Sequence, residues 1–161
     1  MKAKQYPNQN EIREWFEYRN GELYWKINKA ARIKIGQLAG VVNKEKYKQV
    51  GINGKIYLQH RLIWIMFNGD ISDNMVIDHI NRNKTDNRIE NLRIVSRSIN
   101  RLNTNSKNIT TYNLAGGEIA YRGKYAINGK ELSKSFDTEQ KAIDWVTKKK
   151  SEIFENSSEL S

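Results

Sequence analysis

The alternation of apolar and polar positions predicts a chain of short strands interrupted by a few helices. Near the start, Ile12, Trp15 and Phe16 share one face of a helix expected over residues 10–18. Three Asn-Gly pairs predict hairpin turns, because this dipeptide tolerates the positive φ angles that a two-residue turn requires. The pairs are Asn20-Gly21, Asn53-Gly54 and Asn128-Gly129. The strands expected around them are residues 23–25, 36–42, 46–52, 55–58, 109–112, 119–128 and 130–136.

The remaining segments have helical or mixed spacing. Residues 59–68 form an expected helix that Gly69 ends, and residues 75–103 are expected to run strand, loop, strand, helix. A last helix is expected from Thr138 to about Phe154. Asp137 is its predicted N-cap, with Gln140 three residues further on.

These elements predict an α+β protein made of three modules. The first is a small β-rich module over residues 1–57, and the second is the mixed segment over residues 58–103. A polar linker at residues 104–108 leads to a module of three strands and a helix over residues 109–155. Residues 156–161 are expected to be a frayed tail.

Basic residues outnumber acidic ones by 28 to 18, which gives a net charge of +10. That balance is expected of a protein that binds nucleic acid; the alternative is a basic protein that is merely soluble. Residues 1–60 carry a net charge of +7. Lysines recur through the expected strands there, either as a basic ribbon for a DNA groove or as the solvated face of a small sheet. The candidate DNA contacts among them are Lys26, Lys34, Lys46, Lys48 and Lys55.

The chain contains no cysteine and two histidines. This excludes disulfide scaffolds, thiolate zinc sites and cysteine nucleophiles. The longest apolar run, residues 62–67, is far too short to span a bilayer, and the first residues lack the apolar core of a signal peptide. We therefore expect a soluble protein of the cytoplasm that does not engage a membrane.

Residues 76–100 bring the groups needed for phosphodiester hydrolysis into one short segment. Asp78 and His79 are adjacent on an expected strand, so their side chains point to opposite faces. His79 is a candidate base for activating water, while Asp78 and Asn100 offer the oxygen ligands that Mg²⁺ or Mn²⁺ prefers. The alternative is a core Asp-His pair in an asparagine-rich hairpin.

The surrounding residues resemble the HNH endonucleases, and more narrowly the phage and intron-associated homing type. The resemblance implies a ββα-metal fold with one divalent cation, His79 as general base and Asp78 as a metal ligand. It implies that Asn91 fixes the shape of the loop, and that Asn100 takes a third position where many relatives have histidine. The matching segments are His60-Arg61-Leu62-Ile63-Trp64, Asn68-Gly69-Asp70-Ile71, Ile77-Asp78-His79-Ile80-Asn81, Asp86-Asn87-Arg88-Ile89-Glu90-Asn91-Leu92-Arg93 and Asn100.

The last module is similar to the DNA-binding domain of plant ethylene-response factors. The similarity rests on residues 124–130 and 136–142, and it implies a three-stranded sheet that reads the major groove. The alternative is a small α+β cap without a DNA role. The contacts implied are Tyr121, Arg122, Lys124 and Tyr125.

The expected function is that of a metal-dependent HNH endonuclease that nicks or cuts double-stranded DNA at a preferred site. It would act as a monomer in a phage-infected or bacterial cell and require no protein partner. The alternative is a sequence-specific DNA-binding regulator that keeps the scaffold without cutting. His60 is expected to be structural or to contact phosphate, and the alternative is a catalytic role. The remaining candidate DNA contacts are Arg61, Arg82, Lys84 and Arg93.

Overall fold

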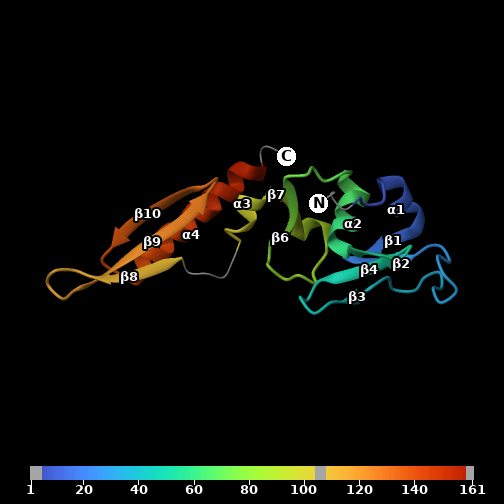
Figure 1. Ribbon diagram of the computed structural model, residues 1–161, viewed down its shortest axis with the longest axis horizontal. Helices are drawn as coiled ribbons and strands as arrows, with labels where there is room; N and C mark the ends of the chain where they lie inside the picture. Colours follow the sequence, from blue (N-terminus) through green and yellow to red (C-terminus); the bar gives the residue numbers. More distant parts are fainter. Residues whose placement is uncertain (1–4, 104–107, 159–161) are drawn as a thin grey trace. The chain divides into compact units, whose positions relative to one another are not determined.

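The protein is described by a computed structural model that covers residues 5–103 and 108–158 (Figure 1). The chain divides into two compact units, Met1–Ile94 and Val95–Ser161. Both contain helices and antiparallel strands, which confirms the predicted α+β class. All but the last residue of the linker predicted at 104–108 lies outside the described residues, as does the end of the predicted tail, residues 159–161.

The first unit begins with a helix that is shorter than the sequence predicts. Helix α1 (Gln9–Trp15) starts at a capping box in which Asn8 and Glu11 each accept a hydrogen bond from the other's backbone nitrogen, at 2.9 Å. It stops before Phe16 because strand β1 (Phe16–Arg19) pairs with β2 (Glu22–Trp25), a register that sets Phe16 opposite Trp25. The helix predicted to reach residue 18 is therefore wrong in its last turn.

A three-stranded sheet follows, in the order β3-β4-β5. Its strands are β3 (Val41–Val42), β4 (Lys48–Ile52) and β5 (Lys55–Leu58). The long strand predicted over residues 36–42 is wrong except at β3, because Gly36 and Gly40 have φ angles of 78° and 106° that break an extended run. The predicted Asn53-Gly54 turn is confirmed, with φ angles of 51° and 73°.

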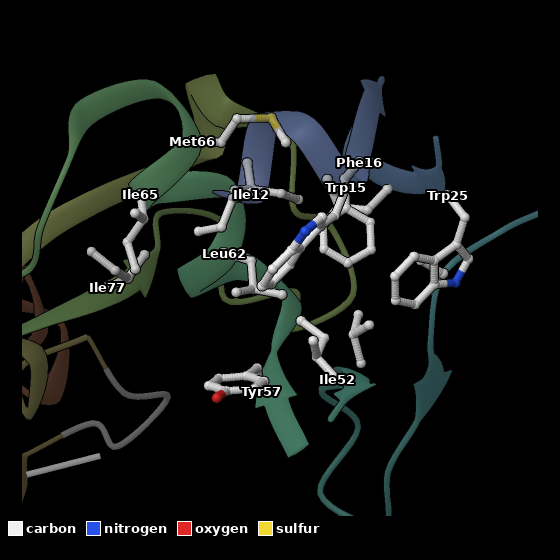
Figure 2. Packing of buried hydrophobic residues seen from close by; sticks show 14 of the residues in the cluster. Ile12, Trp15, Phe16, Trp25, Ile52, Tyr57, Leu62, Ile65, Met66 and Ile77 are labelled. Atoms are coloured by element: carbon white, nitrogen blue, oxygen red, sulfur yellow. The ribbon is translucent and has the colours of Figure 1, made fainter. Parts of the chain in front are cut away.

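Helix α2 (Gln59–Asn68) has the predicted bounds and forms the centre of the first unit's core. Its buried apolar residues pack with Ile12 from α1 and with aromatic residues of the β1–β2 hairpin (Figure 2). The core residues contributed by α2 are Leu62, Ile63, Ile65 and Met66. The first two positions of the helix, Gln59 and His60, are also buried although they are polar.

After α2 the chain follows the predicted order of strand, loop, strand and helix. Strand β6 (Met75–His79) forms a two-stranded sheet with β7 (Leu92–Ser96), and the loop between them ends in a short 3-10 helix, η1 (Ile89–Asn91). Helix α3 (Arg97–Asn100) comes directly after β7.

The second unit contains a three-stranded sheet in the order β10-β9-β8, with one long helix lying along it (Figure 1). The elements are β8 (Ile109–Asn113), β9 (Ile119–Ile127), β10 (Lys130–Phe136) and α4 (Glu139–Ser158). Thr138 rather than the predicted Asp137 caps α4, because its hydroxyl accepts from the Lys141 nitrogen at 3.3 Å. The helix also continues past Phe154, into the segment predicted as a tail.

At Gly123 the sheet and α4 are in close contact. A Cβ atom there would lie 2.9 Å from Val146 Cγ2 on the helix, so a larger residue has no room. In the described part of the chain, no helix combines the length and apolar character needed to cross a membrane.

Candidate functional site

Asp78 and His79 are the last two residues of β6, and both are buried. Asp78 faces Arg93 of the neighbouring strand β7. Its Oδ2 atom accepts two hydrogen bonds from that guanidinium, from Nε at 2.9 Å and from Nη2 at 2.8 Å. Because a charge-assisted pair of this kind is stronger and more directional than a neutral hydrogen bond, it fixes the orientation of the carboxylate.

His79 is held by a different set of groups. Its Nε2 atom lies 2.9 Å from the side-chain oxygen of Asn87, in the loop after β6. Asn87 in turn donates through Nδ2 to Gln59 Oε1 at 2.8 Å, and Gln59 Nε2 donates to the backbone oxygen of Ala39 at 3.0 Å. These buried hydrogen bonds therefore connect the imidazole to the first turn of α2 and to the segment before β3.

The second histidine lies against the first. The His60 and His79 rings meet edge to face with centroids 4.9 Å apart, and the Tyr47 ring lies 5.5 Å from that of His60. Burial, then the neighbouring His79 and Arg61, lower the pKa of His60 to about 3, so its ring is neutral at physiological pH. Within the described residues its Nδ1 atom is buried without a hydrogen-bond partner. Among the roles predicted for His60, burial favours the structural one.

Asn91 ties together the two ends of the loop between β6 and β7. Its side-chain oxygen accepts from the Asn81 backbone nitrogen at 3.0 Å, and its Nδ2 donates to the Asn81 side chain at 3.0 Å and to the Asp86 backbone oxygen at 2.7 Å. Asp86 is further held by Arg88, whose hydrogen bonds keep the pKa of this carboxyl well below its usual range. Hydrogen bonds between its own residues thus define the conformation of the loop.

The β1–β2 hairpin packs directly on this loop. Gly21 in the hairpin turn has a φ of 85°, and a Cβ atom there would lie 2.8 Å from the Arg88 backbone nitrogen. Beside this contact, Tyr18 Oη accepts a hydrogen bond from the Ile89 nitrogen at 3.0 Å. The predicted N-terminal module and the part of the predicted central module up to Ile94 therefore pack together in the first unit.

The metal site predicted from Asp78 and Asn100 involves both units. Asn100 ends α3 in the second unit, so its pairing with Asp78 remains a prediction. Among residues 5–103 and 108–158, no group of three or more His, Cys, Asp or Glu side chains is placed to hold a metal. The predicted donors are carboxylate and amide oxygens, which suit Mg²⁺ or Mn²⁺ when water and substrate oxygens complete the shell.

The basic residues predicted to contact DNA differ in how accessible they are. Lys48 forms an ion pair with Glu22, and Arg61 stacks on the Tyr6 ring with 4.8 Å between its guanidinium carbon and the ring centroid. Lys84 Nζ lies 4.6 Å from the centroid of the Tyr47 ring. Those with exposed side chains in the first unit are Lys26, Lys34, Lys46, Lys55, Arg82 and Lys84.

The four contacts predicted in the second unit lie on two faces of its sheet. Tyr125 packs against Trp145 of α4, with ring centroids 5.6 Å apart, and it is buried. Since side chains alternate along a strand, Tyr121 shares that face, while Arg122 and Lys124 lie on the face away from α4. Tyr125 therefore has almost no exposed surface to offer DNA, whereas Arg122 is exposed.

Sequence reasoning missed Asn87 as the partner of His79 and Gln59 as the partner of Asn87. Asn87 is one of several asparagines in the loop, and Gln59 lies 28 residues before it in the chain. The available signal was Gln59 itself, a polar residue at the start of the apolar α2 segment, for which a buried position demands a partner.

Comparison with known proteins shows which protein family this part of the chain is similar to. Residues 57–102 match the family described as HNH endonuclease, a segment that contains α2, β6, the loop, β7 and α3. One relative is the DNA endonuclease I-HmuI of Bacillus phage SP01, which is 30% identical over 95 residues, covering 54% of this chain and 55% of I-HmuI. The chain thus spans about half the length of the curated relative it matches.

One solved structure also resembles this chain. It is described as "DNA binding and cleavage by the HNH homing endonuclease I-HmuI" and is 21% identical in sequence. The similarity covers 88% of this chain and 82% of the other, with a TM-score of 0.47.

Proposed function

We propose that this protein is a metal-dependent DNA endonuclease of the HNH homing type, which hydrolyses phosphodiester bonds in double-stranded DNA. The observation that carries the proposal is that the family match and the fixed Asp78–His79 pair fall in the same segment. The segment that matches HNH endonucleases, residues 57–102, is also where Asp78 and His79 end one strand and where hydrogen bonds fix both side chains. A core Asp-His pair without chemistry would not require this agreement.

In the proposed mechanism His79 is the general base. Its imidazole takes a proton from the attacking water, a role that typically contributes about 10²–10⁴ in rate. The neutral His60 ring beside it adds no competing positive charge. Asn91 holds the loop that carries Asn87, so the imidazole keeps one orientation through the reaction.

Asp78 and Asn100 are the residues that would hold one divalent cation, Mg²⁺ or Mn²⁺. When bound, such an ion stabilises the negative charge that builds up at the phosphoryl group and on the leaving oxygen. The protein's own residues present oxygen donors of fixed orientation. For Asp78, the two hydrogen bonds from Arg93 fix that orientation.

DNA affinity is proposed to come from two surfaces. The first 60 residues carry a net charge of +7, and the described part contains exposed lysines for phosphate contacts. The second unit would use its sheet in the manner of an ethylene-response-factor domain, with Arg122 and Lys124 on the face opposite α4. We propose a monomer that acts in the cytoplasm of a bacterial or phage-infected cell.

The direct test is incubation of supercoiled plasmid DNA with the full chain and Mg²⁺ or Mn²⁺, followed by addition of EDTA. We expect nicked or linear products that EDTA prevents. His79→Ala should lower cleavage by about 10²–10⁴ while leaving DNA affinity nearly intact, because base catalysis and binding are separate roles. Cleavage by His79→Ala at the wild-type rate would contradict the assignment. Binding without any cleavage would instead support a DNA-binding regulator.

The metal ligands are tested separately, by titrating cleavage against Mn²⁺. Asp78→Ala and Asn100→Ala should each raise the Mn²⁺ concentration that gives half-maximal activity. Asn100→His should be partly tolerated, because many of the HNH endonucleases that this segment resembles have histidine at this position. Unchanged half-saturation in both alanine variants would rule out an ion shared by Asp78 and Asn100.

A further inference from the structure

A chain of buried amides ends on the imidazole of His79, and it has a fixed direction. The three hydrogen bonds join Ala39 O, the Gln59 side chain, the Asn87 side chain and His79 Nε2, at 3.0, 2.8 and 2.9 Å. Gln59 and Asn87 are each 1% exposed and His79 is 4% exposed, so these bonds are shielded from bulk water.

The direction is set at the Ala39 end. A backbone carbonyl can only accept, so Gln59 must present Nε2 to Ala39 and Oε1 to Asn87. Asn87 must then present Nδ2 to Gln59, which leaves its oxygen facing His79. Flipping both amides would set Gln59 Oε1 against the Ala39 oxygen at 3.0 Å with no hydrogen between them, a buried contact that costs the full desolvation of both atoms.

The ring nitrogen that faces an acceptor must carry the hydrogen. We propose that Asn87 and Gln59 are positioning residues that lock neutral His79 in the tautomer protonated at Nε2, so that Nδ1 is the nitrogen that takes the proton from water. This inference rests on the proposed function for its catalytic consequence. The tautomer itself is a property of the folded protein and can be measured without any cleavage.

Positioning of this kind matters because the two ring nitrogens are not equivalent. In a neutral imidazole one nitrogen is a donor and the other an acceptor, and only the acceptor can serve as a base. In water the ring can exchange between tautomers and rotate, whereas the buried Asn87 oxygen stabilises one form and one ring orientation. For histidines that ligate a metal, loss of such an outer partner typically costs on the order of 10- to 100-fold in metal affinity or activity, and we expect a fall of that order here.

The first experiment reads the tautomer by NMR. The full chain is labelled with ¹⁵N-histidine and two-bond ¹H–¹⁵N correlations are recorded near pH 8, about where an unperturbed imidazole is neutral. Only two histidines contribute, and His79→Gln identifies their signals. We expect His79 to be protonated at Nε2 in the wild type and to populate both tautomers in Asn87→Leu. A wild-type ring protonated at Nδ1 would overturn the proposal, whether or not the protein cuts DNA.

The second experiment separates positioning from packing with two variants at one site. Asn87→Leu and Asn87→Asp have similar shapes and both lose the hydrogen bond to Gln59. Only Asn87→Asp keeps an oxygen that accepts from His79 Nε2. If Asn87 were merely structural, Asn87→Asp would have the lower kcat of the two variants, because its buried carboxylate would face Gln59 Oε1. Positioning predicts the reverse in kcat, with KM for DNA unchanged in both.

The expected result is a fall in kcat on the order of 10- to 100-fold for Asn87→Leu, with most of the activity retained by Asn87→Asp. Asn10→Leu, at an exposed position on α1, is the matched control for an asparagine-to-leucine change. Equal losses in both Asn87 variants would overturn the proposal. Absence of cleavage by the wild type would instead count against the proposed function, and the NMR result would still decide the tautomer.

Discussion

The turn residue Gly21 and the loop residue Arg88 are in backbone contact. A Cβ atom at Gly21 would lie 2.8 Å from the Arg88 nitrogen and 3.1 Å from the carbonyl carbon of Asn87. The Asn20-Gly21 hairpin turn therefore presses on the same loop segment whose Asn87 side chain holds His79. A side chain at Gly21 would therefore displace Asn87, which holds the candidate base His79, although Gly21 lies far from both in the sequence.

Gly21→Ala should destabilise the first unit more than a strained turn alone would. Gly54 is the matched control, because it occupies the same type of turn with a φ of 73° and a Cβ atom there would meet nothing within 4 Å. We expect Gly54→Ala to cost about 1–2 kcal/mol from the left-handed backbone, and Gly21→Ala to cost roughly 1–3 kcal/mol more from overpacking. Urea unfolding followed by tryptophan fluorescence compares them. Equal losses of unfolding free energy in the two variants would mean that the loop moves away from the added side chain at no energetic cost.

Arg93→Met should be costlier than the same change at Arg88. Both arginine side chains make two hydrogen bonds to an aspartate, but the Arg93 side chain is 22% exposed and the Arg88 side chain 45%. Losing a hydrogen-bonded partner of the buried Asp78 should cost about 1.5–3 kcal/mol. The more exposed pair should be worth up to about 1 kcal/mol. The same unfolding measurement tests this, and equal effects would show that burial of Asp78 is unimportant.

His60 should make stability depend on pH. Its pKa is about 3 in the folded state against an ordinary value of 6.5, so the unfolded chain binds a proton that the folded one excludes. Proton binding by the unfolded chain therefore lowers the free energy of unfolding as the pH falls from 6.5 toward 3, and it has no effect well above pH 6.5, where both states are neutral. Between about pH 7 and about pH 5 the loss should be about 2 kcal/mol.

The change His60→Phe isolates this effect. It keeps a ring against His79 and Tyr47 but removes the titrating group. Unfolding free energies measured at both pH values should therefore fall less steeply on acidification in the variant than in the wild type. Parallel curves would mean that His60 can be protonated without unfolding.

The double variant Arg122→Gln with Lys124→Gln should weaken DNA binding in a salt-dependent way. If these side chains bind phosphates, the slope of log affinity against log salt should flatten by about 0.9 for each phosphate that is no longer neutralised. Lys130→Gln with Lys134→Gln removes the same charge from the opposite face of the same sheet. Fluorescence anisotropy over a salt series measures both. Identical slopes for the two variants would argue against a DNA-reading face.

Local rules predicted the parts of the fold that are decided locally. The three Asn-Gly turns and the bounds of α2 follow from φ requirements, apolar spacing and a terminal glycine, and all are confirmed. The spacing of Phe16 from Ile12 predicts a helical position for Phe16. The pairing of β1 with β2 overrides that spacing, and pairing is a tertiary fact that the local pattern does not contain.

The candidate site divides along the same line. Asp78, His79 and Asn91 could be selected because their residue types and spacing carry chemistry. The partners Gln59 and Ala39 could not, since they lie 28 and 48 residues before Asn87 and any of several asparagines could have faced the imidazole. Long-range contacts of this kind depend on how the segments pack, which no short motif records.

The anchoring of the amide chain at Ala39 has a consequence for transplanting this domain. The segment that matches HNH endonucleases begins at residue 57, downstream of both Ala39 and Gly21. A chimera that carries only residues 57–102 into another scaffold would bring His79, Asn87 and Gln59 but leave the terminal carbonyl behind. The amides would then be free to flip together. A transplanted fragment should therefore begin before the first hairpin. A fragment that begins at residue 57 would carry the HNH motif without the carbonyl that sets the direction of its hydrogen bonds.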